Sequence, residues 1–419
     1  MAQETPAGGF VKSGFEEVEK VFRDNIRSGL EKGGSFAVYY RGELVVNIWG
    51  GECDALCRRE WKQETVSCIY SCTKTISAVV IAHLVDRGLL KYSEYISTYW
   101  PEFGQNGKDK IRLEEFLCHK AGLAGIEDDS YRLSLLVDNP RKLGEILAKQ
   151  KPLWKPGHQY GYHVHTFALY LDQIVRRVDW KFRGLAQYFG EEIAKEFDLR
   201  IDIGLPKKSQ YKCAKISINR SDGQLVDTHG EISMSGDPKL LAIVNQGWKH
   251  AHIINNPDFM CLPSGSSHGF STAEALAKFH SILAAGGTLN GKQLISKYTL
   301  ELMKQPLTKG YDVTTGAQDI FGLGIMIFPV VENDKVTYMF GHSGFGGQIG
   351  LSDSQYQVGS AYITNHLNLL STFKSGVQDS RYLVYQALYK CIHKIEKKIV
   401  KRTVFQSLAD IQNAVKSKL

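Results

Sequence analysis

The sequence predicts an α+β fold in which helices cover an antiparallel sheet. Apolar runs typical of strands occur early, at about residues 33–51, and return one after another between about residues 321 and 365. Helical periodicity dominates the long stretch between these two groups of strands. Consecutive strands favour antiparallel pairing, and the early strands must join the late ones to complete a sheet. The intervening segment is therefore expected to form a second, mostly helical lobe, with a cleft between the lobes as the natural place for a site.

The first part of the chain predicts a helix, a hairpin and a second helix. Residues 14–32 carry apolar side chains at spacings of three and four, which indicates a helix. The next segment contains two apolar runs around an Arg41-Gly42 turn and predicts a β-hairpin. Residues 72–87 return to helical period, and Gly88 is placed to end that helix.

The later part of the chain returns from helices to strands. The segment STAEALAKFHSILAAGG predicts a helix that Ser271 or Thr272 caps. Residues around 202–265 look irregular. Four short apolar runs bounded by Gly or Asn then predict strands: FGLGIMIFPVV, KVTYMFGH, GQIGLSD and QVGSAYITN. A final helical segment is expected over about residues 376–417.

Composition excludes several classes of protein. The 419 residues carry a formal net charge of +7, but the basic residues are scattered. The densest basic run, HKIEKKIVKR, alternates with apolar residues, which indicates a surface helix rather than a nucleic-acid tract. The first 14 residues lack the apolar core of a signal peptide, and no stretch reaches the roughly 18 apolar residues of a membrane span. The eight cysteines form no CxxC pair, so reduced thiols in a soluble intracellular protein are expected.

A serine followed three residues later by a lysine is the pattern most suggestive of chemistry. A free hydroxyl is a poor nucleophile, and a lysine one helical turn away with a depressed pKa can take its proton. The sequence contains three such pairs: Ser71 with Lys74, Ser209 with Lys212, and Ser371 with Lys374.

Context separates the first pair from the other two. Ser71 precedes an amphipathic helix, so its hydroxyl can sit at a helix N-terminus, where free N–H groups favour a developing oxyanion. An N-cap role for Ser71 is the alternative. Ser209 lies in a polar stretch and Ser371 in a predicted loop, and both are interpreted as solvated surface serines.

Two further patterns are weaker candidates. Gly265 to Gly269 form a Gly-x-Ser-x-Gly string around Ser267, but the residues before it are no convincing strand, so the string is interpreted as a loop rather than a nucleophile elbow. His163 and His165 could be metal ligands, yet no third ligand lies nearby in the sequence, and core or surface histidines are expected.

Five segments carry a family resemblance when they are taken together. One is the helix that contains Ser71, IYSCTKTISAVVIAHLVDRGLL. The other four are YWPEF (99–103), FLCHKAGL (116–123), WKPGHQYGYHVHT (154–166) and FGHSGFGGQIG (340–350). In this order, over about residues 10–390, they resemble the serine β-lactamase-like family, which includes class C β-lactamases, D-aminopeptidases and related carboxylesterases.

The resemblance implies a fold and a domain division. The fold would be the β-lactamase/transpeptidase-like α/β sandwich with an antiparallel sheet and a mostly helical second lobe. A β-lactamase-related catalytic domain would cover residues 10–390. Its sheet lobe would comprise about 10–70 and 320–390 and its helical lobe about 71–320. A C-terminal helix and tail, residues 391–419, would follow.

The resemblance also implies roles for particular residues. Ser71 would be the nucleophile, with Lys74 and Tyr162 accepting its proton and passing it to the leaving group. The backbone N–H groups of Ser71 and Phe345 would form the oxyanion hole. The local version of the family's Lys-Thr-Gly strand would be His342-Ser343-Gly344, and these residues would contact the substrate. No metal or other cofactor is implied.

Two departures from class C β-lactamases bear on the substrate. Val164 occupies the position of the Asn in the Tyr-x-Asn pattern, and His342 replaces the lysine that steadies the β-lactam carboxylate. Both changes remove groups that grip a penicillin and leave the acyl-transfer residues in place. An esterase or amidase acting on small or hydrophobic acyl substrates is therefore expected. The alternatives are a non-catalytic scaffold that keeps the fold, and a D-peptidase or β-lactamase.

The C-terminus carries a separate signal. The chain ends in Ser417-Lys418-Leu419, the tripeptide that the peroxisomal import receptor recognises. We therefore expect the import receptor as a partner and the peroxisomal matrix as the location, with the cytoplasm as the location otherwise.

Overall fold

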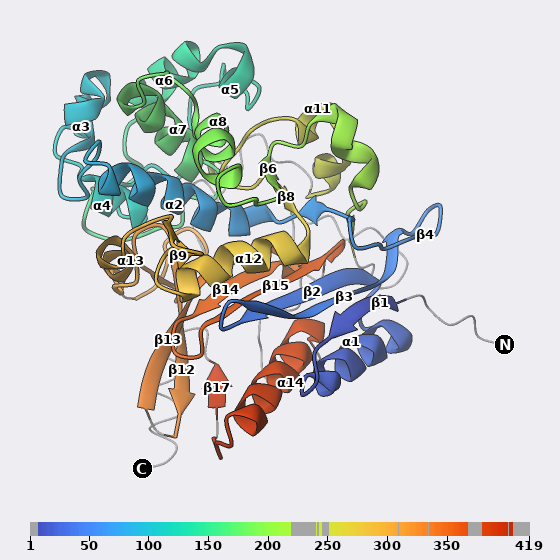
Figure 1. Ribbon diagram of the computed structural model, residues 1–419. Coiled ribbons are helices and arrows are strands. Elements are labelled where there is room, and N and C mark those ends of the chain that lie inside the picture. The colour runs from blue at the N-terminus through green and yellow to red at the C-terminus, as the bar shows by residue number, and fades with distance from the viewer. Residues whose placement is uncertain are drawn as a thin grey trace.

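The computed structural model centres on one large antiparallel sheet with helices on both faces (Figure 1). The structure describes residues 7–218, 240, 243–244, 251–308, 310–333, 335–367, 379–400 and 402–404. The sheet order is β1-β3-β2-β15-β14-β13-β12-β11, with β4 paired to β3 and β17 paired to β12. Its strands are β1 (Ala7–Val11), β2 (Gly33–Tyr40), β3 (Glu43–Asp54), β4 (Arg59–Glu60), β11 (Ile320–Phe321), β12 (Met326–Glu332), β13 (Lys335–Ser343), β14 (Ile349–Asp353), β15 (Val358–Thr364) and β17 (Arg402–Val404).

One helix from the N-terminal part of the chain and one from the C-terminal part cover one face of this sheet. Helices α1 (Glu16–Ser28) and α14 (Ser380–Ile395) lie against each other and against the sheet, as Figure 1 shows in blue and red. Their apolar stripes, with Val18 and Phe22 on α1 and Leu388 on α14, form a core with alternate residues of the strands.

The other face of the sheet carries α12 (Ala273–Ala284), which packs along β15, β2 and β14. A second core continues from α12 into the helical lobe. The remaining helices are α2 (Thr73–Asp86), α3 (Ile96–Tyr99), α4 (Leu113–Leu117), α5 (Leu135–Asp138), α6 (Pro140–Lys149), α7 (Phe167–Val178), α8 (Leu185–Tyr188), α11 (Pro257–Met260) and α13 (Lys297–Met303). Short 3₁₀ or π turns are η1 (Tyr70–Cys72), η2 (Pro101–Gly104), η3 (Phe189–Ala194), η4 (Lys207–Lys212), η5 (Ala251–Asn255) and η6 (Phe345–Gly347).

The described residues also form three smaller sheets. Strand β5 immediately precedes η1 and pairs with β8, which in turn pairs with β6. The strands are β5 (Ser67–Cys68), β6 (Ile201–Ile203), β7 (Ser217–Ile218), β8 (Gly269–Ser271), β9 (Thr288–Leu289), β10 (Lys292–Gln293) and β16 (His366–Leu367), of which β7 and β16 are parallel partners.

The expected architecture is confirmed in most of its elements. The first helix, the hairpin about Arg41-Gly42, the helix over 72–87 and the late strands all form. The Thr272 hydroxyl accepts the N–H of Ala275 and caps α12, as the capping pattern predicts.

Two elements differ from what the sequence predicts. Within the predicted helix over 376–417, the described residues are helical from Ser380 to Ile395, and residues 402–404 form β17 instead. A domain boundary at residue 391 therefore falls inside α14. Strand β1 was not predicted, because its five residues include two glycines and lack strand periodicity. It forms because Gly9, at a φ of 112°, fits against β3, where a Cβ would lie 2.1 Å from the carbonyl oxygen of Asn47.

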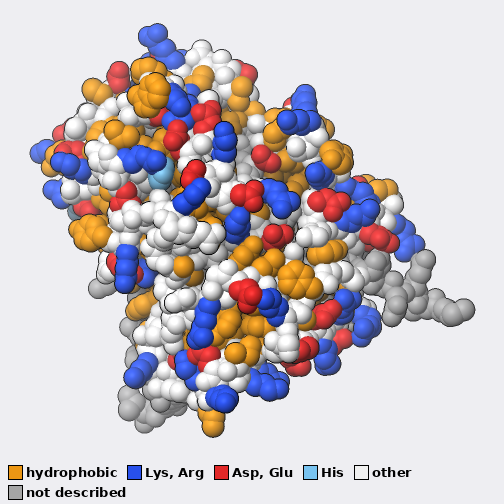
Figure 2. All heavy atoms as spheres, viewed as in Figure 1, with side chains coloured by type: hydrophobic (Ala, Val, Ile, Leu, Met, Phe, Trp, Pro, Cys, Tyr) orange, Lys and Arg blue, Asp and Glu red, His pale blue; other side chains and the backbone are white. Residues whose placement is uncertain are grey.

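The surface charges and the hydropathy of the helices can be compared with what the composition predicts. Basic and acidic side chains are interspersed over the face that Figure 2 shows. Within the described ranges, no helix has the length and apolar character needed to cross a bilayer. The eight cysteines all lie in those ranges, and none is in a disulfide.

Candidate active site

Ser71 lies in η1, between strand β5 and helix α2. The residue before it, Tyr70, has a φ of 43°. This left-handed conformation is costly for a tyrosine, so contacts with the surrounding structure must stabilise the turn. Two contacts hold this turn against the sheet. The Tyr70 ring lies edge-on to Phe345 with centroids 5.8 Å apart, and the Cys72 thiol donates to the carbonyl oxygen of His342 at 3.1 Å. Ser71 itself is half-buried.

Lys74 follows one turn later and is completely buried, because every residue of α2 from Thr73 to Leu84 is buried. Its Nζ lies 3.3 Å from Ser71 Oγ and donates to two carbonyl oxygens, those of Val164 at 2.7 Å and Ser266 at 2.9 Å. Burial holds the pKa of Lys74 well below its usual range. A neutral amine has two N–H groups and one lone pair. Because the carbonyls take both N–H groups, the lone pair is left for the Ser71 hydroxyl.

Tyr162 completes this cluster. Its ring lies beside the amine, with Lys74 Nζ 4.8 Å from the ring centroid. Its hydroxyl hydrogen-bonds to the Ser71 side chain. Burial raises the pKa of Tyr162, so the phenol is protonated at neutral pH and can donate.

A loop between residues 310 and 319 fixes the backbone of Tyr162. Asp312 Oδ2 accepts the N–H of Tyr162 at 2.9 Å, and Oδ1 accepts the backbone N–H groups of Thr314 at 2.7 Å and Thr315 at 3.0 Å. The Tyr162 ring also stacks on Phe321, with centroids 5.6 Å apart. Asp312 thus connects the turn of this loop to the position of the phenol.

His342 lies on the sheet side of Tyr162, and it is neutral. Burial lowers the pKa of His342 to about 3. The 2.6 Å contact between its Nδ1 and the carbonyl oxygen of Ser343 places the proton on Nδ1. The bare Nε2 therefore faces the hydroxyl of Tyr162, 3.5 Å away.

The end of β13 leads into η6, beside the nucleophile. Gly344 approaches Ile69 so closely that a Cβ would lie 2.5 Å from its carbonyl oxygen. Phe345 begins η6, and the first N–H groups of a helical turn have no partner within that turn. Gln348 closes the turn, because its carbonyl oxygen accepts the N–H of Gly344 at 2.7 Å.

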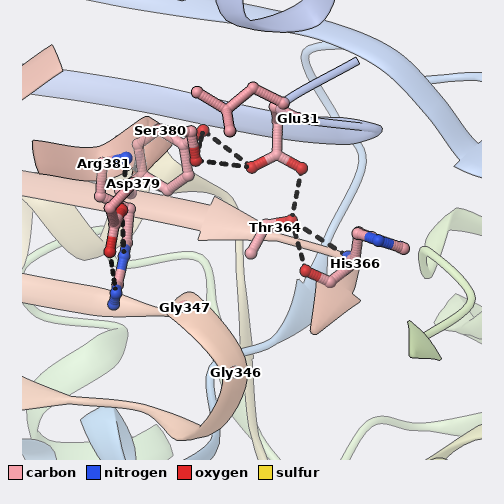
Figure 3. A pocket seen from close by; sticks show the side chains of 10 residues that line it. Glu31, Gly346, Gly347, Thr364, His366, Asp379, Ser380 and Arg381 are labelled. Carbon is pink, nitrogen blue, oxygen red and sulfur yellow. Dashed lines mark hydrogen bonds and ion pairs between the residues drawn. The ribbon is translucent and has the colours of Figure 1, made fainter. Parts of the chain in front are cut away.

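A buried polar network supports η6 from behind. The Gln348 side chain bonds to both backbone groups of Thr364, at 2.8 and 2.9 Å. The Thr364 hydroxyl donates to the Glu31 carboxylate at 2.8 Å, and Ser380 at the start of α14 donates to the same carboxylate at 3.3 Å, as Figure 3 shows. A cavity of about 20 Å³ lies between this network and Gly346, room for about one water molecule.

The structure thus brings together the residues that the sequence singled out. Ser71, Lys74 and Tyr162 are mutual neighbours, His342 contacts Tyr162, and Ser343, Gly344 and Phe345 follow His342 along the chain into η6. Among the described residues, no group of three His, Cys, Asp or Glu side chains is arranged to hold a metal ion.

The competing candidates that the structure describes lie elsewhere or have structural roles. Ser209 is in η4, and Ser371 lies outside the described residues. The Gly-x-Ser-x-Gly string is a loop that precedes strand β8, which is the reverse of a nucleophile elbow. In His163 both ring nitrogens bond to backbone, to the N–H of Leu123 at 3.0 Å and the oxygen of Gly161 at 2.7 Å, so it is a core histidine.

Three contributors were not found from the sequence. The carbonyl oxygens of Val164 and Ser266 carry no signal, because every residue has a carbonyl group. Asp312 stands in an Asp-x-Thr pattern that indicates a local turn. Nothing in that pattern indicates that its second oxygen would reach Tyr162.

Fold and site together are those of a serine hydrolase, and comparison with known proteins assigns the family. The sequence profile of the family described as Beta-lactamase matches residues 22–376, so the chain belongs to the beta-lactamase family. The protein "Esterase/beta-lactamase LipL" of Mycobacterium tuberculosis (strain ATCC 25618 / H37Rv) is 27% identical over 383 residues, which span 85% of this chain and 82% of that protein.

Two solved structures are similar to this chain over most of its length. The crystal structure of a family VIII carboxylesterase superposes with a TM-score of 0.80 at 27% identity and covers 92% of this chain and all (100%) of that one. A penicillin-binding protein homologue from Caulobacter crescentus superposes with a TM-score of 0.78 at 28% identity and covers the same shares, 92% and 100%.

Proposed function

We propose that the chain hydrolyses small or hydrophobic esters, and related amides, through an acyl-enzyme on Ser71. The observation that carries this proposal is the environment of Lys74. Its amine is buried, both N–H groups point at carbonyl oxygens, and Ser71 Oγ is its third neighbour at 3.3 Å. A neutral lysine in this arrangement is a base directed at one hydroxyl.

In the proposed reaction, Ser71 Oγ attacks the carbonyl carbon while its proton passes to Lys74 Nζ. The carbonyl oxygen becomes negative and is held by the N–H groups of Ser71 and Phe345, each worth about 3 kcal/mol in such a role. Tyr162 donates its proton to the leaving group as the acyl bond breaks, and the proton on Lys74 restores the phenol. Water then attacks the acyl carbon and gives its proton to Tyr162. The proton of Tyr162 passes to Lys74 and from there to Ser71 Oγ, and the acid is released.

The charge of the site favours uncharged substrates. With a pKa lowered to about 3, His342 offers no positive charge to a substrate carboxylate. Val164 offers no side-chain amide to a β-lactam side chain. The names of the relatives, an esterase/beta-lactamase and a family VIII carboxylesterase, agree with ester hydrolysis.

A panel of p-nitrophenyl esters tests the proposal on the purified full chain. Short and medium acyl esters should be hydrolysed, Ser71→Ala should abolish turnover, and a fluorophosphonate should label Ser71. Ser267→Ala is the matched control and should keep the activity. Loss of activity in Ser267→Ala with Ser71→Ala intact would refute the proposal. Failure of the probe to label a folded wild-type chain would favour the non-catalytic scaffold. Faster turnover of D-amino acid amides or a penicillin than of esters would favour the D-peptidase or β-lactamase alternative.

We also propose that the chain is imported into peroxisomes through Ser417-Lys418-Leu419, which lie outside the described residues. The support is the tripeptide itself. A tagged chain with a free C-terminus should be imported in cells with working peroxisomal import. Deletion of Leu419 should leave the protein in the cytosol with its hydrolase activity unchanged. A full-length protein that remains diffuse would refute this location.

A further inference from the structure

A cavity of about 540 Å³ lies between α14 and the strands β12, β13 and β14, on the α1 and α14 face of the sheet. This volume is within the usual range of small-molecule sites, roughly 300–1,000 Å³. The hydrolytic site does not use it. Because side chains alternate along β13, Met339 faces the cavity, while Phe340 and His342 face the opposite side of the sheet, where His342 meets Tyr162.

The inner wall of the cavity is apolar. The sheet contributes Phe328, Met339, Ile349 and Leu351, and all four are buried. After α14 ends, Ile399 also lines the cavity, although its side chain is otherwise fully exposed to solvent. A completely exposed isoleucine beside an apolar cavity gains most from a ligand that covers it.

The rim is basic. Lys390, Lys394 and Lys398 line the cavity from one side, and no acidic residue of the described ranges lines it. Each of these lysines is exposed. Lys394 has no ion pair within the described part of the chain.

Of the other two lysines, Lys390 has an exposed acidic partner and Lys398 a nearly buried one, and a deeper arginine is already neutralised. Lys390 lies 3.6 Å from Glu17 at the surface. Lys398 pairs with Glu396, which Arg41 also contacts. Deeper in the cavity, Arg402 is held by Glu332 and by Asp353 at 2.7 Å. The uncompensated positive charge is therefore at the mouth and not in the apolar interior.

From this arrangement we propose that the cavity binds one molecule of a single-chain amphipathic anion, such as a straight-chain fatty carboxylate. Its hydrocarbon chain lies between the sheet and α14, and its headgroup meets Lys390, Lys394 and Lys398. In Figure 2 hydrophobic side chains lie among basic and acidic ones over the lower part of the molecule, where Figure 1 places α14. The proposal does not depend on the proposed hydrolysis, because the two sites lie on opposite faces of the sheet.

Calorimetric titration with octanoate, decanoate and dodecanoate, each below its micelle concentration, tests the proposal. The full chain carries Ser71→Ala so that no turnover complicates the titration. One site per chain is expected. The dissociation constant should fall about fourfold per added methylene, equivalent to about 0.8 kcal/mol, until the chain fills the cavity. Decanol, which lacks the charge, should bind about tenfold more weakly than decanoate. Absence of saturable binding, or equal affinity across the series, would refute the site.

Charge reversal at the rim separates this site from general electrostatic attraction. Lys394→Glu should weaken decanoate binding about tenfold. The matched control is Lys397→Glu, an exposed lysine of the same segment that does not line the cavity, and it should leave binding within about twofold. An equal loss in both variants would show that net charge alone attracts the anion and would overturn the proposal.

Three further experiments distinguish other occupants. Wild-type protein labelled at Ser71 with a fluorophosphonate should bind decanoate as before, whereas loss of binding would place the ligand in the hydrolytic site. A chain truncated after Val404 should also bind as before. A large gain in affinity on truncation would mean that residues 405–419 themselves occupy the cavity. Binding to anionic phospholipid vesicles without binding of monomeric decanoate would identify a membrane surface instead and would refute a pocket for a single chain.

Discussion

Among the lysines that the structure describes, two are completely buried, one in the nucleophile helix and one in the turn between η2 and α4, and they differ in a single partner. Lys108 Nζ donates to three carbonyl oxygens, those of Gln105 at 2.9 Å, Ala148 at 2.8 Å and Gln150 at 2.7 Å. Lys74 Nζ has two carbonyl partners and, in the third direction, Ser71 Oγ.

The comparison shows that burial alone does not make a base. Desolvation lowers the pKa of both amines, that of Lys108 to about 8. Three carbonyl acceptors match the three N–H groups of an ammonium ion, so Lys108 has no lone pair to offer and links three backbone segments. Two carbonyls and a hydroxyl match a neutral amine, whose lone pair then faces the hydroxyl proton. The third neighbour of the amine therefore distinguishes a lysine that links backbone segments from a lysine that can act as a base.

Replacing each lysine by methionine gives the largest expected effect and the most direct test of the comparison. Lys74→Met should lower kcat for p-nitrophenyl butyrate about 10³-fold, because a positioned base typically contributes 10²- to 10⁴-fold. Lys108→Met should leave kcat within about twofold. It should lower the free energy of unfolding by about 2–3 kcal/mol, because three buried carbonyls lose their donor. Steady-state kinetics and urea unfolding measure the two effects. The distinction fails if Lys108→Met loses as much activity per folded molecule as Lys74→Met.

A smaller effect is expected at the residue that positions the partner of Lys74. Asp312→Asn replaces one acceptor oxygen by an amide that meets an N–H donor, so the backbone at Tyr162 must shift. We expect kcat to fall about 10- to 100-fold, since small displacements of a reacting group cost rate steeply. Asp128→Asn is the matched control, because Asp128 accepts the N–H of Ser130 in a similar turn on an exposed loop. Equal losses in both variants would contradict a positioning role for Asp312.

A cation added beside Lys74 tests whether the pKa of this lysine controls the activity. Activity should rise with pH as Lys74 loses its proton, because the neutral amine is the base. His342→Lys places a positive charge beside Tyr162 and should lower the pKa of Lys74 further, which moves the acid limb of kcat/KM down by about one pH unit. Inhibition by benzylpenicillin should strengthen, because its carboxylate gains a cationic partner. An unmoved acid limb would show that the limb does not report Lys74.

The residues that the sequence singles out for the site lie together in the structure, whereas the chain ends differ from what the sequence predicts. Ser71, Lys74 and Tyr162 were identified because their chemistry needs particular side chains in segments that resemble a known family. The sequence does not indicate that Lys108 is buried, because a lysine in a polar turn looks solvated and carbonyl partners carry no sequence signal. The helix predicted through residue 417 ends at Ile395. Beyond it, alternation of Lys and apolar residues fits a strand as well as a helix, and pairing with β12 decides between them only in three dimensions.

His280 extends the comparison to a buried histidine that has a hydrogen-bond partner for only one of its two ring nitrogens among the described residues. The Ser352 hydroxyl donates to the backbone oxygen of His280 at 2.9 Å, so it accepts the proton of His280 Nδ1, also at 2.9 Å. Among the described residues Nε2 has no hydrogen-bond partner. A Cβ at Gly350 would lie 2.4 Å from Nε2, so Gly350 leaves the space that the ring occupies. A second proton on this ring would therefore be buried without an acceptor.

Burial accordingly lowers the pKa of His280 to about 3 in the folded chain, while about 6.5 is expected when the chain is unfolded. The unfolded chain binds the extra proton first, so the contribution of His280 to stability is complete above pH 6.5 and is lost as the pH falls toward 3. Between pH 6.5 and 5.5 this loss is about 1 kcal/mol. His280→Gln should remove that part of the pH dependence, whatever it does to stability at pH 8. Urea unfolding at a series of pH values measures it, with the exposed His158→Gln as control. Parallel curves for wild type and His280→Gln would show that the ring is protonated without penalty, and that a missing partner matters less here than the two lysines imply.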